Sequence, residues 1–130
     1  MRIPLTTDKR RELLKRELQK HIGQRYYCPA LGAKVRVTAS SITETAQHAA
    51  RSIAGTRLAL RLPLVIKMAA KTRRGLEPKP GTQTKEFHFL EIITMVAEIK
   101  GIGKAKLTVG RKRQIKKNKY IEYCITELRA

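Results

Sequence analysis

The residues best suited to chemistry in this chain lie within one short stretch, Ser40–Ser52, which reads SSITETAQHAARS. His48 can take up or release a proton near neutral pH, and Arg51 can stabilise the negative charge of a phosphate. If the stretch is helical, these two residues are three positions apart and share a helix face. Metal-independent RNA cleavage needs a base for the 2′-hydroxyl, an acid for the leaving oxygen and cations for the charged intermediate.

Three further residues are candidates for the same chemistry: His88, Tyr123 and Thr126. His88 stands in an apolar stretch that alternates like a strand, so it could face a site or be a core histidine with satisfied ring nitrogens. For His48, the alternative is a surface or half-buried helix position with no catalytic role. Packing alone requires neither His48 nor Arg51, and this keeps both as candidate site residues.

The charge of the chain favours a polyanionic partner. Its 130 residues include 29 Lys and Arg against 10 Asp and Glu, which gives a formal net charge of +19. A field of that sign attracts nucleic acid, because neutralised phosphates release counterions. The segment 100–120 contains no acidic residue and nine basic ones, which we predict to contact phosphates: Lys100, Lys104, Lys106, Arg111, Lys112, Arg113, Lys116, Lys117 and Lys119. The alternative is a sheet edge that lysines protect from aggregation.

The pattern predicts contact with the nucleic-acid backbone rather than reading of bases. Aromatic residues are few, and no recognition-helix motif or zinc finger is present. Among nucleic acids we favour RNA over DNA, because the candidate chemistry uses the 2′-hydroxyl. An acidic protein that neutralises the charge is the other partner that the composition suggests.

No cofactor or metal is expected from the sequence. Three His and two Cys at scattered positions lack metal-ligand spacing, and Gly101–Lys104 lacks the pattern of a phosphate-binding loop. Cys28 and Cys124 are expected to be small buried hydrophobes, although a disulfide between them is not excluded.

The chain shows no sign of membrane insertion or secretion. The N-terminus lacks the apolar run of a signal peptide, and charged residues and a proline interrupt the longest apolar segment, Leu58–Ala70. We therefore predict a cytoplasmic protein that does not contact membranes.

Helices are expected in the first half of the chain. Thr6–Asp8 offers an N-cap for an amphipathic helix that ends near Gly23. A short hairpin follows within Gln24–Thr38. Ser41 and Glu44 match a capping box for a second helix, ended by Gly55. Its small-residue stripe, Ile42, Thr45, Ala46 and Ala49, predicts close packing on a sheet. Thr56 can then cap a core helix over Arg57–Ala70, which Pro63 must break or restart.

Strands are expected in the second half. Lys71–Lys85 is rich in Gly and Pro and is predicted to be a loop. Lys85–Ile99, Lys104–Arg111 and Tyr120–Thr126 then alternate as strands, with a basic hairpin tip at Gln114–Asn118. We therefore predict an α+β fold in which N-terminal helices pack on one face of an antiparallel sheet that ends in a three-stranded meander. Residues 1–130 form one domain in this prediction, with an amphipathic helix at 1–23 and the core at 24–130.

Parts of the chain resemble a known family. The run Val35–His48, the leucine-rich helix with Leu62-Pro63, the strand Glu86–Leu90 and the closing strands look like a polyvalent-protein nuclease-like domain. Such domains belong to the barnase/EndoU/colicin/RelE-like superfamily and are carried by phages and conjugative elements. The resemblance covers roughly residues 34–128.

The resemblance implies a ribonuclease-like fold, an RNA-directed function and an origin in a mobile element. Ser41, Thr45, His48 and Arg51 match the N-terminal motif of the family, and Tyr123 and Thr126 match its final strand. The chain departs from the pattern by carrying Glu44 and Gln47 where a more basic helix is expected.

Three hypotheses follow. The first is a nucleic-acid-binding domain of nuclease-like fold that extends to metal-independent ribonuclease activity. The second is a non-enzymatic basic protein that binds nucleic acid through segment 100–119. The third is an adaptor whose charge docks an acidic partner.

Overall fold

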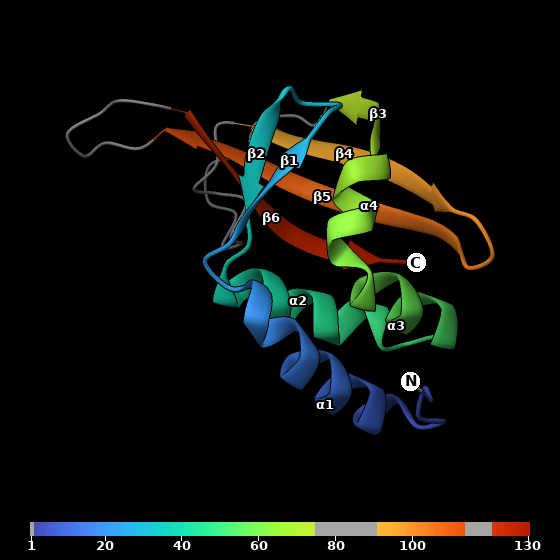
Figure 1. Ribbon diagram of the computed structural model, residues 1–130. Coiled ribbons are helices and arrows are strands. Elements are labelled where there is room, and N and C mark those ends of the chain that lie inside the picture. The colour runs from blue at the N-terminus through green and yellow to red at the C-terminus, as the bar shows by residue number, and fades with distance from the viewer. Residues whose placement is uncertain (1, 75–90, 114–120) are drawn as a thin grey trace, which may run out of the picture.

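The computed structural model describes residues 2–74, 91–113 and 121–130 (Figure 1). In chain order the elements are α1 (Thr7–Leu18), the short 3₁₀ helix η1 (Gln19–His21), β1 (Arg25–Cys28), β2 (Ala33–Arg36), α2 (Ala39–Ala49), α3 (Ile53–Leu60), α4 (Leu62–Met68), β3 (Ala70–Arg74), β4 (Glu91–Ile99), β5 (Gly103–Arg113) and β6 (Ile121–Arg129).

Within these residues the strands form one sheet in the order β1-β2-β6-β5-β4-β3. Strands β4, β5 and β6 pair antiparallel as the predicted meander, and β1 and β2 form the predicted hairpin. The α+β class is confirmed. The sheet is mixed rather than antiparallel, because β2 runs parallel to β6 through Val35↔Tyr123 and Arg36↔Cys124. Helices α2, α3 and α4 and three strands lie between β2 and β6 in sequence, so no local turn signal could indicate this pairing.

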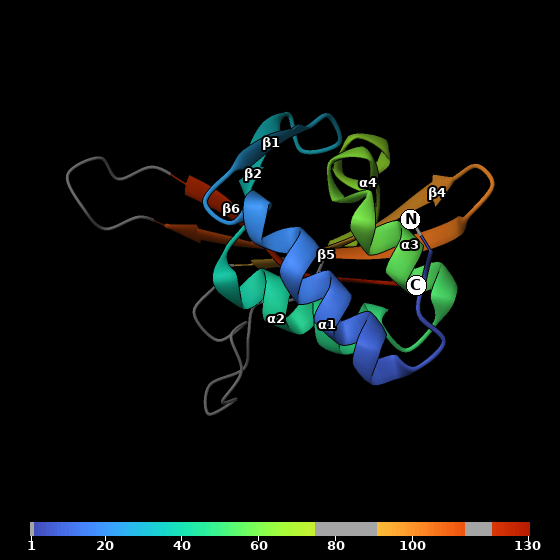
Figure 2. The same cartoon turned by 60° about the horizontal axis from the view of Figure 1, so that its bottom comes forward.

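The helices form two layers on one face of the sheet. Helices α2, α3 and α4 contact the strands, whereas α1 packs mainly on α2 and α3. Figure 2 shows α1 lying across the outer side of α2. The sheet is curled, and α4 contacts β1 at one end of the strand order as well as β4 and β5 near the other.

The hydrophobic core lies between the helices and the sheet. The alternating residues Ile93, Met95 and Ala97 of β4 are buried, as are Leu107 and Val109 of β5. The predicted small-residue stripe of α2 is buried as well: Ile42, Thr45, Ala46 and Ala49. We call the sheet face opposite to Met95 and Leu107 the outer face.

The N-cap of α1 is the one predicted from the sequence, whereas the N-cap of α2 differs from the prediction. Thr6 caps α1 by accepting a hydrogen bond from the Lys9 amide. In α2 the capping box joins Thr38 and Ser41, each side chain accepting a hydrogen bond from the other residue's amide. The predicted box of Ser41 and Glu44 is wrong because Thr38 is extended and the helix begins at Ala39, which makes Ser41 its third residue.

The predicted break at Gly55 is also misplaced. Helix α2 ends at Ala49, and Ser52 caps α3 through the Gly55 amide. Gly55 lies inside α3, where an added Cβ would come within 2.4 Å of the Ala49 carbonyl oxygen. Thr56 is a buried residue of α3 that donates to the Ser52 carbonyl at 2.8 Å, not a cap. Pro63 acts as predicted, because α4 restarts at Leu62 with the proline in its first turn.

The predicted loop Lys71–Lys85 begins too early. Strand β3 pairs with β4 along Ala70–Arg74, and segment 75–85 lies outside the described residues. The same holds for the predicted hairpin tip Gln114–Asn118 and for positions 85–90 of the predicted strand Lys85–Ile99. None of the helices in the described part of the chain has the length and apolar character needed to cross a bilayer.

Candidate acid–base site between α2 and β6

Helix α2 covers the edge of β6 where β2 stops pairing with it. Beyond Cys124, one edge of β6 continues to pair with β5, and α2 supplies hydrogen bonds to the other edge. The Ser41 hydroxyl donates to the Ile125 carbonyl, and the Leu128 amide donates to the Thr45 hydroxyl at 3.0 Å. Both hydroxyls are buried and satisfy backbone groups that would otherwise lack partners.

His48 continues the same face of α2 and reaches a side chain of β6. Its Nε2 lies 3.3 Å from Glu127 Oε2 and 3.6 Å from Glu44 Oε2. The side chains of His48 and Glu127 are 23% and 21% exposed, so the contact is shielded but open to a ligand. The geometry places an imidazole between two carboxylates from different elements.

One ring nitrogen of His48 is unsatisfied. Nδ1 is buried and has no hydrogen-bond partner among the residues that the structure describes, whereas buried polar side-chain atoms in native proteins usually have one. A histidine with a purely structural role between a helix and a sheet would be expected to form hydrogen bonds through both ring nitrogens. The orphaned atom therefore favours a functional role for the ring.

The surroundings of Glu127 on the outer face are basic. Glu127 is the cross-strand partner of Thr108, and Arg129 is that of Lys106, which places these four side chains on one face. Arg129 Nε is 3.9 Å from Glu127 Oε1. Lys106 is exposed. A phosphate near the His48–Glu127 pair would therefore meet cations on the sheet beside it.

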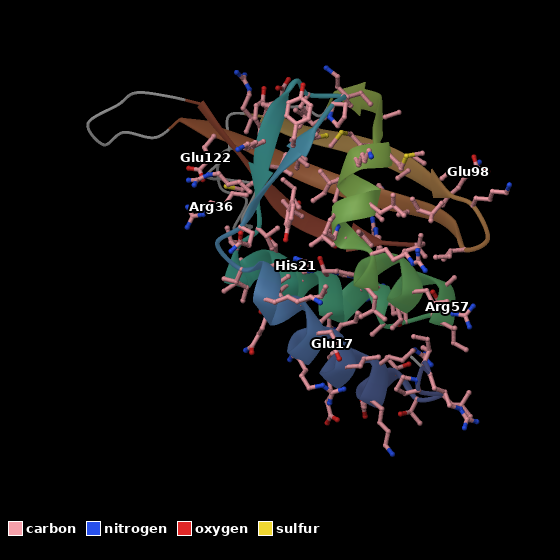
Figure 3. All side chains as sticks on the ribbon, in the orientation of Figure 1. Glu17, His21, Arg36, Arg57, Glu98 and Glu122 are labelled. Atoms are coloured by element: carbon pink, nitrogen blue, oxygen red, sulfur yellow. The ribbon has the colours of Figure 1, made fainter. Side chains whose placement is uncertain are left out.

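A second charged cluster lies farther along the same face. Glu122 is 5% exposed, and its Oε1 contacts Arg36 Nη1 at 3.3 Å and Arg25 Nη2 at 3.9 Å. Figure 3 shows Arg36 and Glu122 side by side at the β2–β6 junction. Because one carboxylate faces two partly exposed guanidinium groups, both arginines are oriented while keeping donors for an anion.

The predicted catalytic residues do not form one cluster. Arg51 is exposed and follows the end of α2, so it does not share a helix face with His48 as expected. Thr126 is buried and donates to the Thr108 carbonyl at 3.1 Å. Tyr123 packs against the hydrophobic core. His88 lies outside the described residues. Of the four members that the structure describes, His48 alone lies in the α2–β6 site.

The predicted phosphate-binding residues also differ in their surroundings. Lys100, Lys104 and Lys106 are exposed, whereas Arg111 pairs with Glu91 at 3.1 Å. Lys112 and Arg113 belong to β5, and their side chains are not among those described. Lys116, Lys117 and Lys119 lie outside the described residues. Sequence reasoning missed Arg25, Arg36 and Arg129, which the topology brings to the outer face.

The acidic partners of His48 were missed as well. Glu44 stands four residues before His48 on a helix, which is a readable signal for contact. Glu127 carries no such signal, because only the packing of α2 on β6 brings it near. The ligand atoms of Glu44, His48 and Glu127 lie within 4.8 Å of one another and could hold a metal ion, a set that the spacing of the His and Cys residues did not indicate.

Other titratable side chains are buried away from this site. Burial lowers the pKa of the His21 imidazole, and the adjacent Lys20 ammonium lowers it further. The His21 ring contacts the hydroxyl of Tyr26, whose pKa burial raises. Burial also raises the pKa of the Cys28 thiol. Cys28 and Cys124 are both buried, as expected for small hydrophobic residues, and they do not form a disulfide with each other.

A separate pocket of about 480 Å³ opens on the helical side of the molecule. It lies between α1, α3 and the β4–β5 turn, and it contains none of the α2–β6 site residues. Its lining includes three cationic residues, one acid and four apolar ones: Lys20, Arg57, Arg61, Glu17, Ile3, Leu18, Leu60 and Ile102. Glu17 and Arg57 are labelled in Figure 3.

The chain matches no known protein family model, and it has no significant match among curated proteins or solved structures.

Proposed function

We propose that this protein binds nucleic acid, RNA in preference to DNA, and cleaves RNA without a metal, with His48 and Glu127 as its acid–base pair. The observation that carries the proposal is the 3.3 Å contact between His48 Nε2 and Glu127 Oε2 beside the basic outer face of the sheet. An imidazole and a carboxylate are the two side-chain types most used to move protons near neutral pH.

The step is a transesterification within the RNA. Glu127 takes the proton of a 2′-hydroxyl, whose oxygen attacks the adjacent phosphorus. Protonated His48 gives its Nε2 proton to the departing 5′-oxygen as the P–O5′ bond breaks. The products are a 2′,3′-cyclic phosphate and a 5′-hydroxyl end. Both proton transfers use side chains, so no metal is needed to generate the nucleophile.

Arg129 and Lys106 supply the positive charge that such a step requires. Arg129 and Lys106 are cross-strand partners of each other, and their side chains lie on the outer face with that of Glu127. Cations in fixed positions stabilise the negative charge that builds up on the phosphorane. Arg129 also contacts Glu127 Oε1, which leaves Oε2 facing His48.

The Arg25–Arg36–Glu122 cluster extends the surface for the RNA backbone. Glu122 and Glu127 are five positions apart on β6, roughly 16–17 Å at the rise of a strand. Two arginines held by a buried carboxylate suit bidentate phosphate binding. An RNA strand could therefore run along β6 from this cluster to the acid–base pair.

The family resemblance supports the same reading. Of the four positions that match its N-terminal motif, Ser41, Thr45 and His48 join α2 to β6, whereas the fourth, Arg51, follows the end of α2. Two of them hydrogen-bond to the backbone of β6, and the third contacts an ionisable side chain. This division matches a motif with two positioning residues and one reacting residue.

The test is cleavage of labelled RNA in the presence of EDTA. We expect cleavage, with a 2′,3′-cyclic phosphate on the 5′ fragment. A matched oligonucleotide with a single 2′-deoxy sugar should be bound equally and left uncut at that position, because the nucleophile is missing. Cutting at the deoxy position would contradict the mechanism.

Two other results would contradict the proposal and favour a different function. Steeply salt-dependent binding of RNA without cleavage would make the protein a non-enzymatic nucleic-acid binder. No binding at low salt would favour the adaptor hypothesis. The basic pocket lined by Lys20, Arg57 and Arg61 is the surface that suits an acidic partner in that case.

A further inference from the structure

Three side chains of the α2–β6 site have the types and positions of metal ligands. Glu44 and His48 are one turn apart on α2, and Glu127 faces them from β6. We propose that these residues bind a divalent transition-metal ion of the Zn²⁺ class, and that the bound ion switches the site off. The switching clause rests on the proposed ribonuclease function, and the binding clause does not.

The distances fit an ion better than they fit hydrogen bonds. His48 Nε2 lies 3.3 and 3.6 Å from the two carboxylate oxygens, whereas charge-assisted N–H···O bonds are about 2.7–2.9 Å long. Ligands about 2.0–2.1 Å from a tetrahedral Zn²⁺ lie about 3.3–3.4 Å from one another. The two contacts are close to that tetrahedral edge length.

The third distance, between the carboxylate oxygens of Glu44 and Glu127, can shorten when an ion binds. The three ligand atoms lie within 4.8 Å of one another. The side chains of Glu44 and Glu127 are 39% and 21% exposed, so each keeps some freedom to rotate. Two carboxylates repel each other when no cation lies between them, and a divalent ion would draw them together.

The donor set selects the class of ion. An imidazole with two carboxylates suits Zn²⁺ and its neighbours, whereas Mg²⁺ and Ca²⁺ prefer sets made of oxygen alone. Three protein ligands leave a fourth position for water, as in zinc sites that are open to ligands. The partial exposure of all three side chains gives an ion access from solvent.

The local charge permits a cation despite the net charge of the chain. Charges on a protein surface are screened over about 8 Å at physiological ionic strength. Only ten acidic residues are present in the sequence, and two of them meet at His48. The carboxylate oxygens that face His48 are Glu44 Oε2 and Glu127 Oε2, while Arg129 lies at the other oxygen of Glu127.

A bound ion would block the proposed proton transfers. It would occupy His48 Nε2 and Glu127 Oε2, the two atoms that release and accept protons in the cleavage step. Zinc would therefore inhibit cleavage, and EDTA would restore it. The same ion would join α2 to β6 and raise the stability of the fold.

The test is zinc binding to the metal-stripped 130-residue chain, measured without RNA by calorimetry and by thermal unfolding. We expect one Zn²⁺ per chain and a melting temperature that rises with zinc. Loss of a residue that only hydrogen-bonds to a metal ligand weakens metal binding about 10–100-fold, so loss of a ligand itself in His48→Gln or Glu127→Gln should weaken binding at least tenfold. Glu98→Gln removes an exposed acid from β4 and should leave the affinity unchanged.

Glu44→Gln provides a second variant at a more exposed position, in case the other two variants do not fold. Zinc binding that is absent in the wild type, or unchanged in both His48→Gln and Glu44→Gln, would overturn the proposal. Zinc binding by a protein that cleaves no RNA would leave this proposal standing and remove the ribonuclease function. If the protein binds zinc at these residues and zinc does not affect cleavage, the proposed inhibition by zinc would be overturned and the metal site would stand.

Discussion

His48 on α2 lies 3.3 Å from Glu127 on β6, and the contact joins a helix in the first half of the sequence to the last strand. It is the third in a row of contacts, after Ser41 with Ile125 and Thr45 with Leu128. The first two contacts satisfy the backbone of a strand edge. The third brings together two ionisable groups, so one helix face serves both architecture and chemistry.

The hydrogen bond from the Leu128 amide to Thr45 should be important for stability. Thr45→Val keeps the volume and leaves a buried N–H without an acceptor, which should cost about 1–3 kcal/mol. Urea unfolding measures the change in the free energy of unfolding. Thr43→Val in the same helix is the matched control, because Thr43 is exposed and should change stability by less than about 0.5 kcal/mol. Equal effects of the two variants would argue against the edge-capping role of Thr45.

Gly55→Ala should destabilise the protein although it raises helix propensity. The new Cβ would come within 2.4 Å of the Ala49 carbonyl oxygen and 2.9 Å of Ser52 Oγ. Forcing a methyl group into packed structure typically costs about 1–3 kcal/mol, more than the gain of about 1 kcal/mol in propensity. Thermal unfolding gives the sign. A stabilised Gly55→Ala variant would show that α2 and α3 approach less closely than described.

The buried His21 should make the fold less stable in acid. Its pKa is lowered by burial and by Lys20, so the unfolded chain binds this proton more readily than the folded one. The stabilisation is complete above the unfolded pKa of about 6.5 and is lost as the pH falls through the folded value. Unfolding free energies from pH 7.5 downward should therefore fall less steeply for His21→Gln than for the wild type. Parallel curves would exclude this role.

Arg36 should contact the RNA backbone. Arg36→Gln should lower the slope of log affinity against log salt by about one unit and weaken binding to all sequences alike. Arg57→Gln removes the same charge from the helical side and is the matched control. We expect the salt slope to change for Arg36 alone. Equal changes in both variants would show that only the net charge of the chain matters.

The sequence predicted most of the elements because their signals are local. The spacing of Leu13, Leu14 and Leu18 marks α1, and the alternation in β4, β5 and β6 marks the meander. The burial of the α2 stripe followed from the same periodicity. The cap of α2 was misplaced because Thr38 and Ser41 satisfy the same three-residue spacing as Ser41 and Glu44, and the sequence alone does not choose between them.

The sheet partners and the site could be predicted only in part, because they depend on contacts between distant residues. The parallel pairing of β2 with β6 places Arg36 near Glu122, and no local pattern connects the two. His48 was a candidate from its residue type and the Ser41–Thr45–His48 spacing. Its partner Glu127 was not, because an acid in a strand gives no sign of which helix will cover it.

The most direct test of the central claim compares RNA cleavage by the wild type, His48→Ala and Glu127→Gln in EDTA, with RNA affinity measured in parallel. We predict that each substitution lowers the cleavage rate at least about 100-fold, the range for loss of a general acid or base, while RNA affinity falls less than about tenfold. The control Glu98→Gln should cleave like the wild type. Cleavage by His48→Ala at the wild-type rate would contradict the account.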